Sequence, residues 1–174
     1  MEKRHLNRGL CCAVFVSCCM IALSAPPLAP RAAAADGFLA RFAGTWIGQG
    51  AVRQTEDAAR EAVYCRVTAE LSPDGSKLQQ SGRCAVGDQS RRVKGTLIYD
   101  EARRLVTGSW SGVREGPVQV SGQRRNDRLV MQLKYKLKGD DASSSMTLET
   151  ISDGRYRMSV AGPEGRGEIE FLRQ

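Results

Sequence analysis

The sequence predicts an all-β fold in the form of an antiparallel up-and-down β-barrel of about 8–10 strands. Apolar and polar residues alternate with a period of two through nearly every segment after Phe42, and no stretch keeps a period of 3.6. Turn-forming residues separate these segments at short, even intervals, which is typical of a β-sandwich or barrel. Because the turns are short, consecutive strands are expected to pair in a simple meander.

The expected elements begin with a single helical turn at Phe38–Phe42, followed by a first strand at Thr45–Arg53. Glu56–Glu61 is expected to form at most one more helical turn. Several later segments alternate clearly enough to give one buried and one wet face: Val63–Leu71, Leu129–Leu137, Tyr156–Val160 and Ile169–Phe171, the last within a final strand Gly167–Arg173.

Turn signals of the Gly, Pro, Asn and Asp type punctuate these strands. They occur at Pro73–Gly75, Gly87–Asp88, Asp100–Glu101, Glu115–Pro117, Asn126–Asp127, Gly139–Asp141, Asp153–Gly154 and Gly162–Pro163. Glycines within the strand-like segments, at positions 95, 108 and 122, fit the sharp bends that a small barrel needs.

The first 35 residues have the pattern of a cleaved secretory signal peptide. Three basic residues precede the apolar run Leu10–Ala25, and the small residues Ala32–Ala35 follow it. The run is shorter than the roughly 20 residues of a membrane-spanning helix, so no stable membrane span is expected after cleavage. A lipoprotein site at Cys18 is the other alternative. We therefore expect residues 36–174 to form a single domain in the periplasm or outside the cell.

Cys65 and Cys84 are the cysteines that follow this leader, and in an oxidising compartment such a pair is usually a disulfide. The turn at Pro73–Gly75 lies between them and would place them on neighbouring strands. A redox-active pair is the alternative, but no Cys-x-x-Cys spacing is present.

The composition argues against common kinds of catalysis. The single histidine, His5, lies in the leader, and no serine stands at a telling spacing from a lysine. Adjacent acidic residues, which could act as a pair in a glycosidase, fall in predicted turns, where they are explained as solvent-exposed loop residues. We therefore expect no enzyme activity, no metal site and no cofactor.

The segment Phe42–Trp46 contains Gly-x-Trp after a short turn, and it resembles the opening of lipocalin-type barrels. The resemblance implies that Trp46 closes one end of the barrel, covered by Arg173 or Arg166. The chain is also similar to a family of small exported alphaproteobacterial proteins of uncharacterised function. They share the Gly44–Gly50 pattern, a cysteine pair across a hairpin and Gly108–Trp110.

We expect the barrel to bind a small apolar or amphipathic ligand, or a lipid, in its interior. The residues expected to line it are Trp46, Tyr99, Trp110, Met131, Tyr135, Tyr156, Met158 and Phe171. The smaller or polar Thr107, Gly122 and Gln80 would leave room for a cavity.

The alternative is an envelope module with a packed core that meets a protein or a polyanion through its surface. Arginines Arg91–Arg92, Arg103–Arg104 and Arg124–Arg125 with Arg128 would form an anion-attracting collar if they share one rim. Anionic lipid or lipopolysaccharide is the partner expected for such a collar. Nucleic acid is not expected, because stacking aromatics are sparse.

Overall fold

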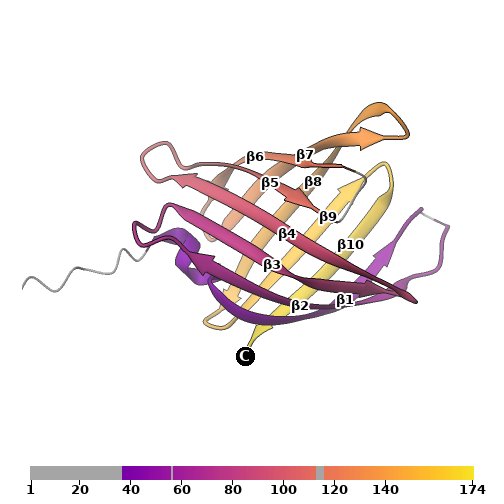
Figure 1. Ribbon diagram of the computed structural model, residues 1–174, viewed down its shortest axis with the longest axis horizontal. Coiled ribbons are helices and arrows are strands. Elements are labelled where there is room, and N and C mark those ends of the chain that lie inside the picture. Colours follow the sequence, from indigo (N-terminus) through magenta and orange to yellow (C-terminus); the bar gives the residue numbers. More distant parts are fainter. Residues whose placement is uncertain (1–36, 56, 113–115) are drawn as a thin grey trace, which may run out of the picture. The chain divides into compact units, whose positions relative to one another are not determined.

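The computed structural model describes residues 37–55, 57–112 and 116–174, which form a closed barrel of ten antiparallel strands. Each strand pairs with the next in sequence, and β10 pairs with β1 to close the sheet. The all-β up-and-down barrel predicted from the alternating pattern is therefore confirmed (Figure 1). The predicted leader lies outside the described residues.

One short 3₁₀ helix, η1 (Phe38–Phe42), precedes the barrel. The strands are β1 (Gly44–Arg53), β2 (Glu61–Leu71), β3 (Lys77–Val86), β4 (Gln89–Asp100), β5 (Leu105–Ser111), β6 (Val118–Arg125), β7 (Arg128–Leu137), β8 (Asp140–Ser152), β9 (Arg155–Gly162) and β10 (Gly165–Arg173). The predicted turn at Phe38–Phe42 is confirmed. Residues 57–60 are not helical, and β2 begins at Glu61, so a helical turn over Glu56–Glu61 is wrong for the described part of that segment.

The two ends of the barrel differ because η1 covers only one of them. The β2–β3, β4–β5, β6–β7 and β8–β9 connections lie at the end that η1 covers, which we call the η1 end. The remaining five connections lie at the opposite end, which we call the mouth. Figure 1 shows η1 and the β9–β10 hairpin at opposite ends of the strands. Among the described residues, no helix has the length and apolar character needed to cross a membrane.

The β2–β3 turn at the η1 end is held by hydrogen bonds to one carboxylate. The hydroxyls of Ser72 and Ser76 donate to the carboxylate of Asp74 at 2.5 and 2.7 Å. These bonds favour the charged form and lower the pKa of Asp74 to about 2. The turn that the Pro73–Gly75 sequence predicts is therefore also stabilised by side chains.

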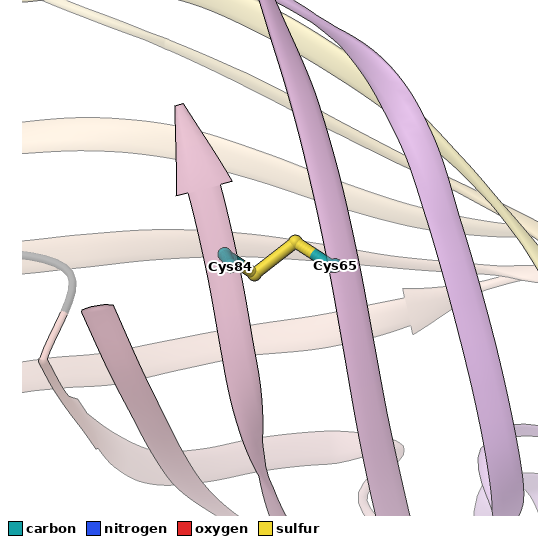
Figure 2. Close-up of a disulfide and its surroundings, with 2 residues drawn as sticks. All are labelled: Cys65 and Cys84. Atoms are coloured by element: carbon teal, nitrogen blue, oxygen red, sulfur yellow. A yellow bond between two sulfur atoms is a disulfide. The ribbon is translucent and has the colours of Figure 1, made fainter. Parts of the chain in front are cut away.

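The predicted disulfide between Cys65 and Cys84 is present (Figure 2). The two residues lie directly opposite each other on β2 and β3, with their Cα atoms 4.1 Å apart. Cys65 is fully buried. The bridge joins two strands that are already paired, so it fixes their register from the inner side of the barrel.

Candidate ligand-binding site

The interior at the η1 end is packed with aromatic side chains. Tyr156 stacks on Phe171 with ring centroids 4.6 Å apart, and its edge meets Trp46 at 4.7 Å. Phe42 of η1 packs on the same tyrosine at 5.3 Å, and Phe38 packs on Tyr99 at 5.8 Å. All six rings are buried, so this end of the interior is filled by the protein itself.

Two tyrosine side chains within this packed region are buried away from solvent. Burial raises the pKa of Tyr156, against the smaller opposing effect of a hydrogen bond with Gln80. The hydroxyl of Tyr99 is buried and has no hydrogen-bond partner among the described residues. Gln80 therefore points inward, as expected, but it serves a tyrosine of the core.

Arg173 covers the tryptophan that the sequence pattern singles out. Its guanidinium carbon lies 4.3 Å from the centre of the Trp46 ring, and it donates hydrogen bonds to the carbonyls of Ala43 and Arg41. Arg166 lies opposite Arg53 at the mouth. Of the two arginines expected at this position, Arg173 is the one that the structure places there.

The mouth differs, because inward-facing apolar side chains there remain partly exposed. They pack against the buried core on one side and reach solvent on the other, and they come from seven different strands: Val52, Val86, Val93, Trp110, Leu137, Ala142 and Val160. At the η1 end the corresponding aromatic side chains are buried. The mouth is thus a partly open apolar ring that is not covered by a helix within the described residues.

Polar groups accompany this apolar ring. Below it, the hydroxyls of Tyr135 and Ser144 lie 2.8 Å apart and are both buried. Arg91, opposite Cys84 near the start of β4, is exposed and donates to the side-chain oxygen of Gln89 at 3.2 Å. The carboxylate of Glu61, at the start of β2, accepts from the side chain of Gln54 at 3.0 Å.

The eight residues predicted to line the interior do not form one site. Trp46, Tyr156, Phe171 and Tyr99 belong to the packed η1 end, while Met131 lies opposite Met146 in mid-barrel. Tyr135 lies below the mouth. Trp110 and Met158 are the two residues of the set that are partly exposed. The smaller aliphatic residues of the ring were missed, although their parity with buried neighbours on the same strands would have found them.

Two of the residues predicted to leave room for a cavity in the barrel interior, Thr107 and Gly122, do not do so. Thr107 is exposed on the outer face, because its neighbour Val106 takes the buried position on β5. Gly122 lies so close to β7 that an added Cβ would sit 2.2 Å from the carbonyl oxygen of Val130. This glycine therefore permits close packing of two strands and leaves no cavity.

The basic pairs do not gather at one rim. Arg91 and Arg92 lie at the mouth, whereas Arg103, Arg104 and the Arg124–Arg128 group lie at the η1 end. Several of the second group are occupied: Arg103 pairs with Asp100 at 2.7 Å, and Arg128 pairs with Glu149 at 2.9 Å. A single arginine collar is therefore wrong.

Comparison with known proteins gives the fold. No protein-family model matches the sequence, and no curated protein matches it significantly. Among solved structures, the chain is similar to the S-type phycobiliprotein lyase from Guillardia theta, with a TM-score of 0.60 and 12% identity over 79% of this chain and 90% of the lyase. The barrel is lipocalin-like.

A second similar structure is a redesigned β-barrel, mFAP1, bound to DFHBI. It has a TM-score of 0.45 and 13% identity over 78% of this chain and 96% of that chain. Neither likeness implies an activity for this chain.

Proposed function

We propose that this lipocalin-like barrel is a binding protein, and not an enzyme, that takes up a small amphipathic molecule through its mouth. The observation that carries the proposal is the ring of inward-facing apolar side chains that remain partly exposed there. An apolar tail that covers them would be stabilised by about 25 cal/mol for each Å² removed from water, before the cost of association.

Arg91 favours a ligand with an anionic head. Arg91 stands two residues before Val93 of the apolar ring on β4, and its guanidinium donates to the neutral side-chain amide of Gln89. A guanidinium can form two parallel hydrogen bonds with a carboxylate. Glu61 also lies near the mouth, with one carboxylate oxygen engaged by Gln54. A fatty-acid-like molecule fits this arrangement, with its head at Arg91 and its tail inside.

The proposal includes export to the periplasm or beyond, and kinship with the small exported alphaproteobacterial proteins that the sequence resembles. The leader-like pattern of residues 1–35 and the disulfide of Cys65 and Cys84 support it, because disulfides persist in oxidising compartments. The lack of any histidine after His5 supports a binding role without catalysis.

The direct test is native mass spectrometry of the protein purified from the cells that export it, before and after organic extraction. An added mass that extraction releases would support the proposal. Titration with dodecanoate, followed by tryptophan emission, would then give an affinity, because Trp110 is partly exposed at the mouth.

Two variants test where the tail binds. Val160→Arg places a long charged side chain in the apolar ring and is expected to weaken dodecanoate binding at least about tenfold. Leu172→Arg is the matched control, because Leu172 is 47% exposed on β10 and outside the ring. Equal effects of the two substitutions, or no uptake by the unsubstituted protein, would count against an interior site.

A third variant tests the head group. Arg91→Gln is expected to weaken binding of dodecanoate and to leave binding of the uncharged dodecanol unchanged. If both ligands weaken together, Arg91 contributes to packing and does not select a charge.

A further inference from the structure

Most outward-facing basic side chains on the later strands have an acidic partner on the next strand. Arg128 of β7 pairs with Glu149 of β8 at 2.9 Å, and Lys136 pairs with Asp141 at 3.0 Å. Arg157 of β9 lies within 3.7 Å of carboxylates of β10, those of Glu168 and Glu170. Opposite charges across neighbouring strands stabilise a sheet modestly.

The outer face of β2, β3 and β4 has the opposite character. Arg66 lies directly opposite Arg83, which in turn lies directly opposite Arg92, so three exposed arginines form one row across three strands. Within the described part of the chain, none of the three forms an ion pair. Figure 1 shows the three strands side by side.

This arginine row carries an energetic cost. Like charges directly opposite one another destabilise a strand pair, and neighbouring strands are only about 4.8 Å apart. Stability of the sheet therefore does not explain the row. A bound anion would offset the mutual repulsion of the guanidinium groups, since each can donate paired hydrogen bonds to a carboxylate, sulfate or phosphate.

The row lines a depression in the outer surface with a volume of about 660 Å³, which also includes Lys94 and Tyr64. Tyr64 is 45% exposed and offers an apolar ring beside the cations. A second depression of about 470 Å³ adjoins the first, and the two share Thr68, Ser81 and Lys94. They form one elongated groove across β2 to β5.

The two halves of this groove differ in chemistry. The first is cationic, and the residues that line it include no carboxylate. The second is lined mainly by neutral, outward-facing hydrogen-bonding side chains: Gln79, Thr96, Ser109 and Ser111. Glu70 is the carboxylate on its lining, two positions along β2 from the shared Thr68. The groove can thus accept anionic groups at one half and hydroxyl groups at the other.

We infer that the outer groove over β2 to β5 binds an acidic oligosaccharide. Its anionic groups would meet the arginine row and Lys94, its hydroxyls would meet the neutral half, and Tyr64 would cover one sugar ring. A bilayer surface fits less well, because the groove is hollow and Tyr64 is the large exposed apolar residue within it. Single-stranded nucleic acid would need several stacking aromatics, where the groove's cationic half has one.

The test is calorimetric titration of the purified protein with tetragalacturonate, with uncharged maltotetraose as the matched saccharide. Binding of the first and not the second is expected, and it should weaken as added salt screens the charges. Equal binding of both sugars, or of neither, would overturn the inference. Inorganic tripolyphosphate and phosphatidylglycerol vesicles serve as competing anions, and tighter binding of either would assign the row to a compact phosphate or a membrane surface.

Arg83→Gln, at the centre of the row, is expected to raise the Kd for tetragalacturonate about tenfold. Arg128→Gln is the matched control, since it removes an outward arginine that is already paired with Glu149. Arg92→Gln provides a second test within the row. Dodecanoate binding at the mouth should be unchanged in all three variants, which separates this groove from the interior site. Equal losses in Arg83→Gln and Arg128→Gln would show a general charge effect and contradict the inference.

Discussion

The guanidinium of Arg173 lies 4.3 Å from the centre of the Trp46 ring, and the two residues are directly opposite each other in the ladder between β10 and β1. Trp46 also donates a hydrogen bond from its indole nitrogen to the carbonyl of Phe42 at 3.0 Å. Together with the bonds from Arg173 to Ala43 and Arg41, this contact holds η1 over the seam where the barrel closes.

Arg173→Ala is therefore expected to lower the free energy of unfolding by about 1–2 kcal/mol, through loss of the cation–π contact and of the hydrogen bonds to η1. Urea denaturation followed by circular dichroism measures this change. Arg155→Ala is the control, because Arg155 makes a longer, exposed contact of 3.6 Å with Glu170 and its loss should cost less than about 1 kcal/mol. Equal losses of unfolding free energy in the two variants would show that the contact with Trp46 contributes no more to stability than an exposed ion pair does.

Reduction of the Cys65–Cys84 disulfide is expected to lower the free energy of unfolding by about 3 kcal/mol, because the bond closes a loop between residues 19 apart in sequence. The measurement is denaturation with and without dithiothreitol. The double variant Cys65→Ala/Cys84→Ala should be insensitive to the reductant. An intact mass that reductant leaves unchanged would show that the thiols were never oxidised.

The buried phenol of Tyr156 gives the barrel a defined sensitivity to alkali. Its pKa is raised in the folded state, so the unfolded chain ionises first, near pH 10. Above that pH the folded state retains more protons, and stability falls by up to about 1.4 kcal/mol per pH unit. Denaturation of the unsubstituted protein and of Tyr156→Phe between pH 8 and 12 should therefore diverge only above about pH 10. Parallel curves would contradict this assignment.

Gly95 is expected to be required for the stability of the barrel, because the indole of Trp110 lies across it. A Cβ at this position would sit 1.7 Å from the indole nitrogen, so Gly95→Ala must displace the ring and should cost about 1–3 kcal/mol. A double-mutant cycle with Trp110→Ala checks the cause, since removal of the ring should abolish most of the cost. Additive costs in the cycle would mean that the glycine serves the backbone instead.

The strands were predictable because their pattern is local. Alternation such as that of Leu129–Leu137 assigns each residue to a face without knowledge of the partner strand, and a shift by one residue would reverse the whole set. The disulfide followed from the same kind of information, since the turn around Asp74 folds β2 directly onto β3. Arg173 and Arg166 were both candidates to cover Trp46. Only the register of β10 against β1 shows that Arg173 lies opposite Trp46, whereas Arg166 lies opposite Arg53.

The features that were missed depend on which connection lies at which end. Arg91 follows the β3–β4 turn and Arg103 follows β4, so successive turns place them at opposite ends of the barrel. Thr107 was placed on the wrong face because the strand around it is short and apolar residues occupy both of its faces: Leu105 shares the outer face with Thr107 although it is apolar, and Val106 is the buried residue. The exposed fraction of the inward-facing side chains at the mouth depends on whether another element covers that end of the barrel. The alternation of residues along one strand carries no information about this.

The arginine row could have been found from one known pair. Because Cys65 lies opposite Cys84, an antiparallel ladder must place Arg66 opposite Arg83. The third member, Arg92, needs the register of the next hairpin, which is set by the tight turn at Gly87–Asp88. The groove that they line depends on the curvature of the sheet and required the structure.

Pairing of β1 with β10 also bears on how the barrel folds. Before that ladder forms, the hairpins between neighbouring strands can assemble, but the sheet keeps two unpaired edges that could pair with another chain. Closure brings together residues from the two extremes of the described chain, so it is entropically the slowest pairing to achieve. Contacts at the seam, including that of Arg173 with Trp46, would then be absent from the folding transition state, and their loss should speed unfolding while leaving the folding rate unchanged.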